Sequence, residues 1–352
     1  MAFFTQIFRS VLEWLYSWMR DYGWATIMFT IMMRMIMLPL DIKNRKSMLK
    51  MQEMQPKINE LQRKYGNDQQ KLQQKQMQLF KEEHYSPFSG CLPILLTWPI
   101  FIVMLGAMRD ISNELLVKQL FTYISGETPL HDGWLWVKNL WIADSPFSAV
   151  VPTMESLRVI PAEIWTKVVS GLTPEQLSAV VANIPNYTED LLSATGGLSK
   201  DQLANTITTL VNAAQLQPAY KSATELLVKN INLFIVNLNI FKTPNGYLIL
   251  PALAVISQLF MTKFTGAQQP AQQPAGKPAN AQQAQQQQTS ETMGKFMKYF
   301  FPIFTGWICL TSSASFALYW VTSNIVAGVS NFVITKYYEN KKSGTAVKEV
   351  IK

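Results

Sequence analysis

The sequence predicts an all-α membrane protein with five transmembrane helices, a cytoplasmic helical hairpin and an extracytoplasmic helical insert. The 352-residue chain is 48% hydrophobic and only 15% charged, whereas about 25% of the residues in an average soluble protein are charged. Its apolar residues gather in separate runs that are long enough for membrane helices. The sign of the charge also changes between the segments that join these runs, as expected when they lie on opposite sides of a membrane.

The net charge of +8 does not favour a nucleic-acid partner, because the basic residues cluster beside the apolar runs, as the positive-inside rule describes. Cys91 and Cys309 both lie inside apolar runs, which argues against a disulfide framework. The first 20 residues lack a small-residue cleavage site. The first apolar run is therefore expected to be a retained span and not a removable signal peptide.

Residues 1–23 are expected to form an amphipathic helix that lies in the membrane interface. Apolar side chains recur there at helical spacing, and polar side chains fall largely on the other side. The apolar positions are Phe4, Ile7, Phe8, Val11, Leu12, Leu15 and Trp18. The same pattern also suits a helix packed against other protein, so both alternatives stay open.

The first span is expected over residues 24–40 and holds a single charge, Arg34, set among methionines. A central arginine facing lipid costs at least about 2.5–3.5 kcal/mol. Arg34 must therefore face something polar. This is either a hydrophilic cavity or, in the alternative, a structural ion pair or a backbone carbonyl at a helix kink.

Residues 41–85 are expected to form a cytoplasmic hairpin of two helices. Gly66 should end the first helix and Asn67 should cap the second. Ten Lys or Arg against six Asp or Glu indicate a cytoplasmic location. A stripe for pairing with another helix runs along the first helix, and three apolar residues of the second can meet it. These residues are Met51, Met54, Ile58, Leu61 and Tyr65, and then Leu72, Leu79 and Phe80.

Seven basic residues of this hairpin form a candidate contact for a ribosome, a targeting receptor or a nascent chain. The alternative is a solvated surface that faces lipid headgroups. The seven residues are Lys43, Arg45, Lys46, Lys50, Lys57, Arg63 and Lys64.

The second span is expected over residues 91–108, where two prolines favour a kinked helix beside a wet or protein-lined surface. Residues 111–245 are more polar, and this region carries more acidic than basic residues, which puts it on the extracytoplasmic side. A helical insert is expected over about 145–228. Thr173 and Ser199 each begin a capping box there, a pattern typical of helix N-termini.

The rest of the chain is expected to cross the membrane three more times, at 246–262, 296–312 and 315–335. Residues 264–293 consist mostly of Gln, Ala and Pro and should form a disordered cytoplasmic linker. The basic tail over 336–352 should also be cytoplasmic. This topology places the N-terminus outside and the C-terminus in the cytoplasm.

Three stretches recur in one family: Arg34 and Pro39 followed by the charged hairpin, PFSGCLP (87–93) with WPIF (98–101), and FP (301–302) with LYWVTSN (318–324). Taken together they resemble the YidC family of membrane protein insertases, which has mitochondrial and chloroplast relatives. Order, spacing and topology match over roughly residues 15–110 and 230–340. The chain departs from the family pattern at Ser86, where asparagine is common, and at Thr97, where glutamine is common. Residues 313–315 also lack the proline that the family often has before LYW.

The resemblance implies an insertase whose spans enclose a hydrophilic groove, with Arg34 in the place of the groove arginine. From polarity and position alone, Thr30, Thr97, Gln258, Thr311, Ser312 and Asn324 are expected to line the groove too. For these residues the alternative is ordinary hydrogen bonding between helices. The expected partners are nascent membrane proteins and membrane lipids, with the ribosome, a targeting receptor and a general translocon as further candidates.

No cofactor is expected, because the sequence lacks a Walker A pattern. His84 and His131 alone cannot make a metal site. The expected protein is thus a chaperone-like insertase of the bacterial cell membrane that is not an enzyme and hydrolyses no nucleotide. Two alternatives remain. One is a membrane scaffold or assembly factor that acts through the insert and the hairpin. The other is a channel or transporter, but the sequence shows no paired inverted repeat and no ring of ionisable residues.

Overall fold

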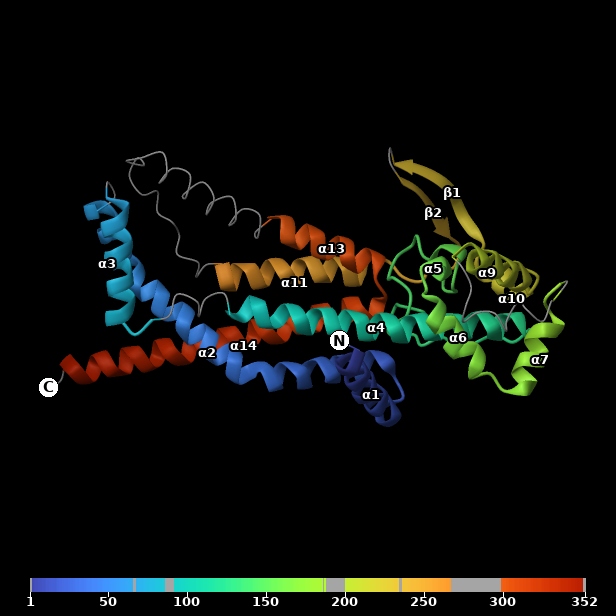
Figure 1. Cartoon of the computed structure of the whole chain (residues 1–352), viewed down its shortest axis with the longest axis horizontal. Helices are drawn as coiled ribbons and strands as arrows, with labels where there is room; N and C mark the ends of the chain where they lie inside the picture. The colour runs from blue at the N-terminus through green and yellow to red at the C-terminus, as the bar shows by residue number, and fades with distance from the viewer. Residues whose placement is uncertain are drawn as a thin grey trace. The chain divides into compact units, whose positions relative to one another are not determined.

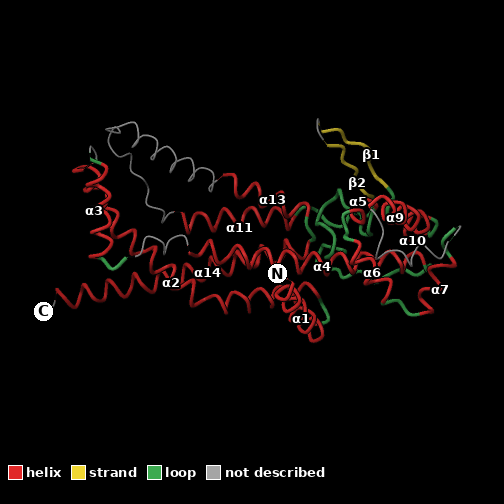
Figure 2. Tube along the Cα trace, in the orientation of Figure 1, coloured by secondary structure: helices red, strands yellow, loops and turns green. Residues whose placement is uncertain are grey.

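The computed structural model describes residues 2–65, 68–85, 92–185, 187, 200–233, 236–266 and 299–350. Over these residues the chain is mostly helical (Figures 1 and 2). It divides into two compact units. The first unit is Met1–Phe29, Val103–Ala252 and Trp307–Tyr319, and the second is Thr30–Ile102, Leu253–Gly306 and Trp320–Lys352.

The first long helix joins two elements that the sequence separated. After α1 (Ala2–Met19), α2 (Tyr22–Tyr65) contains both the predicted first span and the first helix of the hairpin. Pro39 and Pro56 lie inside α2 and do not end it. Each proline removes one backbone donor, while the surrounding Met, Leu, Lys, Gln and Glu all favour helix. No stop signal therefore separates the apolar part of α2 from its charged part.

The second helix of the hairpin is α3 (Gln69–Glu82), and Asp68 is its N-cap, with a carboxylate oxygen that accepts from the backbone N of Lys71 at 3.0 Å. Asp68 thus satisfies a free backbone donor and complements the helix dipole. The predicted stop at Gly66 lies outside the described residues, and the prediction of Asn67 as the cap was wrong, since the N-cap is Asp68, one residue later. Met54, Ile58 and Leu72 are buried, in agreement with the predicted apolar stripe.

The other apolar helices are α4 (Leu92–Ile124), α11 (Ile249–Gly266), α13 (Phe301–Thr311) and α14 (Ala314–Val350). In the part of the chain that the structure describes, two helices are long and apolar enough to cross a membrane, namely α2 and the Ala314–Lys341 portion of α14. The linker predicted over 264–293 lies outside the described residues from 267 on. Most of the predicted tail continues α14 as helix.

The predicted insert contains α5 (Met154–Arg158), α6 (Ala162–Ser170), α7 (Pro174–Ala182), α9 (Lys200–Gln215) and α10 (Pro218–Ala223). Thr173 and Gln176 form the predicted capping box, with bonds of 3.3 Å and 3.0 Å between each backbone N and the other side chain. Ser199, the other predicted cap, lies outside the described residues. Trp165 and Tyr220 are fully buried. Their rings contact Phe121 and Tyr123 of α4, so the core of the insert is shared with α4.

Two strands depart from the all-α expectation. β1 (Leu226–Leu233) and β2 (Val236–Phe241) form an antiparallel hairpin in which Leu226 lies opposite Phe241 and Ile231 lies opposite Leu238 (Figure 2). Asn and apolar residues alternate along much of this segment. That alternation has the period of a strand.

A buried carboxylate connects three helices of the first unit. Glu114 of α4, whose side chain is only 8% exposed, pairs with Arg9 of α1 at 2.7 Å, with Lys118 of α4 at 2.8 Å and with Lys167 of α6 at 2.7 Å. Burial opposes the charged form of Glu114. The hydrogen bonds from the three cations outweigh burial and hold the pKa of this carboxyl well below its usual range. Glu114 thereby fixes α1 and α6 against α4.

Candidate functional site

The arginine of the first apolar run faces a hydroxyl group within the second unit. Arg34 of α2 donates to Ser323 Oγ of α14 through Nε at 2.9 Å and through Nη2 at 2.6 Å. Ser323 is buried, and Arg34 is half-buried. The ion pairs found among the described residues do not include Arg34. Its hydrogen-bonding partner is neutral, and the carboxylate of Asp41 lies near enough to interact with the guanidinium through charge.

A second polar cluster lies one residue further along α14. Asn324 is buried, and its Nδ2 donates to Ser257 Oγ and to Gln258 Oε1 of α11, both at 3.1 Å. Ser257 Oγ in turn donates to the backbone O of Ala254 at 3.0 Å. Two of the residues predicted from polarity, Gln258 and Asn324, are therefore in direct contact. This contact also fits the alternative of ordinary interhelical hydrogen bonding.

The remaining predicted groove residues are placed differently. Thr30 belongs to the second unit and is fully buried. The side chain of Thr97 lies outside the described residues. Thr311 and Ser312 belong to the first unit, where both line a cavity of about 750 Å³ whose wall also includes Arg109 of α4. The hydroxyl of Thr311 donates back to its own helix, to the backbone O of Trp307 at 3.1 Å.

Two residues at this site were not predicted to line it, Ser257 and Ser323. Each stands next to a predicted residue, in the pairs Ser257–Gln258 and Ser323–Asn324. Two adjacent residues of a helix point about 100° apart. Two adjacent polar side chains in an apolar helix can therefore both be hydrogen-bonded within the protein only if polar groups from neighbouring helices surround a broad face of that helix. This pairing of polar residues was the signal that could have identified them.

The hairpin presents most of its predicted basic contact residues to solvent. Lys50 is half-buried, and the exposed ones are Lys43, Lys46, Lys57, Arg63 and Lys64. Arg45 is an exception, since it is only 2% exposed and its Nε donates to Thr335 Oγ1 at 2.8 Å. Placing Arg45 on the contact surface was wrong, because a buried guanidinium bound to α14 cannot meet an outside partner.

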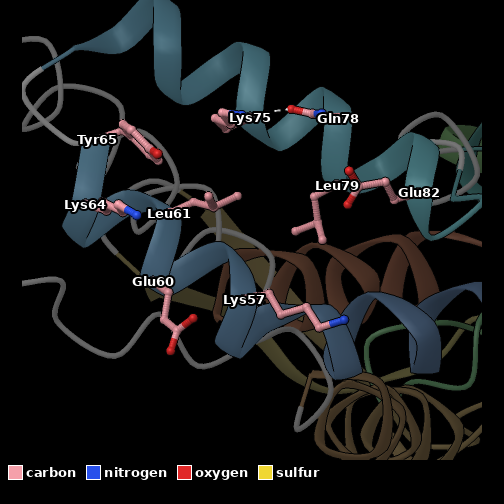
Figure 3. A pocket seen from close by; sticks show the side chains of 9 residues that line it. All are labelled: Lys57, Glu60, Leu61, Lys64, Tyr65, Lys75, Gln78, Leu79 and Glu82. Atoms are coloured by element: carbon pink, nitrogen blue, oxygen red, sulfur yellow. Dashed lines mark hydrogen bonds between the residues drawn. The ribbon is translucent and has the colours of Figure 1, made fainter.

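The two hairpin helices enclose a small cleft of about 360 Å³ (Figure 3). Leu61 of α2 and Leu79 of α3 point into it, and Lys64 and Lys75 stand at its edges. Nearby, Lys57 bridges the helices to Glu83 at 2.6 Å. The hydrogen bond and the charge of Lys57 hold the pKa of Glu83 below its usual range. The cleft therefore combines an apolar floor with a charged rim of three lysines and two glutamates.

The described residues contain no group of three or more His, Cys, Asp or Glu side chains that could hold a metal ion. The arrangement instead offers a charged donor at Arg34 and an amide at Asn324 within the apolar stretches of α2 and α14. Such groups can bind polar parts of another chain by hydrogen bonds and charge.

Several known proteins are similar to this chain in sequence. A protein from Clostridium tetani called membrane protein insertase YidC is 42% identical over 120 residues, which cover 34% of this chain and 48% of that protein. Proteins of the same name from Wolinella succinogenes and Clostridium perfringens are both 35% identical. They match over 147 and 150 residues, or 42% and 41% of this chain and 25% and 56% of theirs.

This chain thus spans only about a quarter to a half of the length of these curated relatives. A family model described as 60Kd inner membrane protein matches residues 14–188 and 203–342, which is most of the chain. By this match, the chain belongs to the 60Kd inner membrane protein family.

Proposed function

We propose that the chain is a membrane protein insertase that moves short polar segments through a hydrophilic groove and releases apolar segments into lipid, without nucleotide hydrolysis. Its family membership and the insertase names of its relatives support this proposal. The groove residues in the second unit are Arg34, Thr30, Thr97, Gln258 and Asn324, while Thr311 and Ser312, which were also predicted for the groove, belong to the first unit.

The observation that carries the proposal is the bonding of Arg34 to a neutral hydroxyl. A structural ion pair would neutralise the guanidinium, and it would then offer little to a passing chain. Ser323 satisfies two of the donors of Arg34 and leaves its charge in place. At an effective dielectric constant of about 20, a carboxylate 4 Å away would gain roughly 4 kcal/mol. Arg34 can therefore attract an acidic segment transiently.

The polar cluster at Asn324 serves the same purpose for neutral groups. Moving a polar segment into hydrocarbon costs several kcal/mol of free energy for each backbone group that is left without a hydrogen bond. Amide and hydroxyl groups such as those of Asn324, Gln258 and Ser257 can exchange their mutual bonds for bonds to water or to a peptide. A hydrated path partway into the bilayer shortens the distance over which the segment is dry. The apolar segment of the substrate then leaves sideways into lipid.

The proposed insertase crosses the bacterial membrane five times, with its N-terminus outside and its C-terminus in the cytoplasm. Nascent membrane proteins are its substrates. The exposed cations of the hairpin, such as Lys43, Lys46 and Arg63, face the cytoplasm in this topology. They offer a contact for a ribosome or a targeting receptor, and the spans offer one for a general translocon.

Site-directed cross-linking tests the groove. A photoreactive residue replaces either Gln258 or Ile256, an exposed residue on another face of α11, and a nascent single-span substrate with an acidic exported tail is stalled during insertion. The proposal expects the polar tail to cross-link to position 258 and not to position 256. Equal labelling of the tail from both positions, or labelling from 256 alone, would exclude a groove at this place.

A further inference from the structure

A tight turn in the first unit presents a leucine to the outside. Trp134 and Val137 face each other across an antiparallel bridge, with N–H···O bonds of 2.8 Å and 2.9 Å in the two directions. Leu135 and Trp136 are the two residues of the tip. Leu135 is 70% exposed, and its backbone φ is 51°.

This conformation has a cost that packing within the protein does not offset. A left-handed backbone at a residue other than glycine costs about 1–2 kcal/mol. Two-residue turns that need positive φ normally use Gly, Asn or Asp there. Because the Leu135 side chain is exposed, its burial does not contribute to the stability of the fold. Strained positions of this kind often cluster at functional sites, so the apolar tip of this turn is a candidate for contact with a partner outside the chain.

The turn stands on a rigid base beside the start of α2. The indole of Trp134 packs against Gly23, where a Cβ atom would come within 2.1 Å of Trp134 Cδ1. It also meets the exposed Trp24 edge to face, with ring centroids 5.9 Å apart. On the other side, Trp136 Nε1 donates to Asp144 Oδ2 at 3.1 Å. The tip is thus held next to the residue at which the apolar run of α2 begins.

We propose that the turn over residues 133–137 is a lipid anchor that seats the extracytoplasmic region in the outer headgroup layer of the membrane. Leu135 enters the acyl boundary, while Trp134 and Trp136 stay at headgroup depth, the level that tryptophan prefers. We assign lipid as the partner because Trp134 of the turn packs against Gly23 and Trp24 at the start of α2, a helix that is long and apolar enough to cross a membrane. The anchor does not depend on insertase activity.

The test uses the full chain in liposomes, with Cys91 and Cys309 replaced by alanine and a polarity-sensitive fluorophore on Leu135→Cys. Aqueous iodide and a spin label attached near the lipid headgroup serve as quenchers. Leu216→Cys is the matched control, because Leu216 is also an exposed leucine of the same unit, at the end of α9. The anchor predicts quenching by the lipid label and several-fold weaker iodide quenching at 135 than at 216.

Iodide quenching at 135 equal to that at 216 would overturn the anchor. Protection from both quenchers would also overturn it, since it would indicate a protein contact. If the labelled variant does not fold, Leu135→Gly with the fluorophore on Lys138→Cys replaces it, because glycine adopts positive φ without strain. Removing the leucine should then increase iodide access at 138 relative to the same probe with Leu135 present. Unchanged access would contradict the proposal.

Discussion

Ser323 accepts both hydrogen bonds that Arg34 directs at α14, through Nε at 2.9 Å and through Nη2 at 2.6 Å. A serine at this position satisfies the geometry of the guanidinium without cancelling its charge. Ser323 therefore holds the arginine in place without neutralising it, whereas a carboxylate at this position would do both.

Ser323→Asp should abolish most of the insertion of a substrate with an acidic tail and should leave the protein folded. The new carboxylate lies within reach of Arg34 and forms an ion pair, with a Coulomb energy of roughly 4 kcal/mol at 4 Å and an effective dielectric constant of about 20. The substrate's carboxylates must then compete with this pair. Insertion into proteoliposomes and thermal unfolding in detergent measure the two effects separately.

Ser323→Asn is the matched control, because it keeps a neutral acceptor at the same place. It should insert the acidic substrate much better than Ser323→Asp. If the two variants insert equally well, the free charge of Arg34 does not contribute to insertion.

Glu114→Gln should destabilise the first unit. The change removes the charge that Arg9, Lys118 and Lys167 share. The two lysines are about half exposed and can regain water, so a loss of about 1.5–3 kcal/mol, the range for a hydrogen bond to a charged group, is expected. A lower unfolding temperature and faster proteolysis of the insert should both appear.

Glu127→Gln removes an exposed carboxylate just after α4 and provides the comparison for Glu114. A change of this kind at the surface usually stays within about 0.5 kcal/mol. A stability loss as large as that of Glu114→Gln would show that charge in general, and not the three-cation cluster, is responsible.

Acidification below the ordinary histidine pKa should destabilise the first unit through His131. Burial lowers the pKa of this imidazole, which lies 3.0 Å from Tyr123 Oη and 3.3 Å from Asn139 Nδ2. The unfolded chain therefore takes up a proton at a higher pH than the folded chain does. The stability from neutral His131 is complete above about pH 6.5 and falls below it, by at most about 1.4 kcal/mol per pH unit.

Unfolding temperatures at pH 7.5 and pH 5.5 test this dependence. Glu114 has a lowered pKa, and its contribution is lost only as the pH drops below the ordinary Glu pKa of about 4.3, outside this window. His131→Gln should reduce the pH dependence, and His84→Gln, at an exposed position in the hairpin, should not. An equal pH dependence in native protein and His131→Gln would reject the assignment.

Much of the helical architecture was predictable because membrane helices and a charged hairpin leave strong patterns. The apolar run around Arg34 and the basic hairpin both appear as helix. The positions at which helices end were harder to predict from the sequence. Pro39 and Pro56 do not interrupt α2, because a helix with favourable residues on both sides survives the loss of single backbone bonds.

The candidate site was predictable only in part. Gln258 and Asn324 were predicted to line a groove and they contact each other, but the partner of Arg34 is Ser323, which was noted in a family motif and not as a groove residue. Which hydroxyl meets a guanidinium depends on the rotation of both helices about their axes, and composition does not determine that rotation. Arg45 shows the same limit, since it shares the basic pattern of its neighbours and is nevertheless buried against Thr335.

The most direct measurement of the proposed function compares native protein with Arg34→Lys and Arg34→Ala in proteoliposomes that contain no nucleotide. The substrate is a short single-span protein with an acidic exported tail, and the fraction protected from external protease is measured. Native protein and Arg34→Lys should insert it, while Arg34→Ala should lose at least about tenfold, the effect of 1.4 kcal/mol in a rate. Insertion by Arg34→Ala at the native level, or none by folded native protein, would contradict the account.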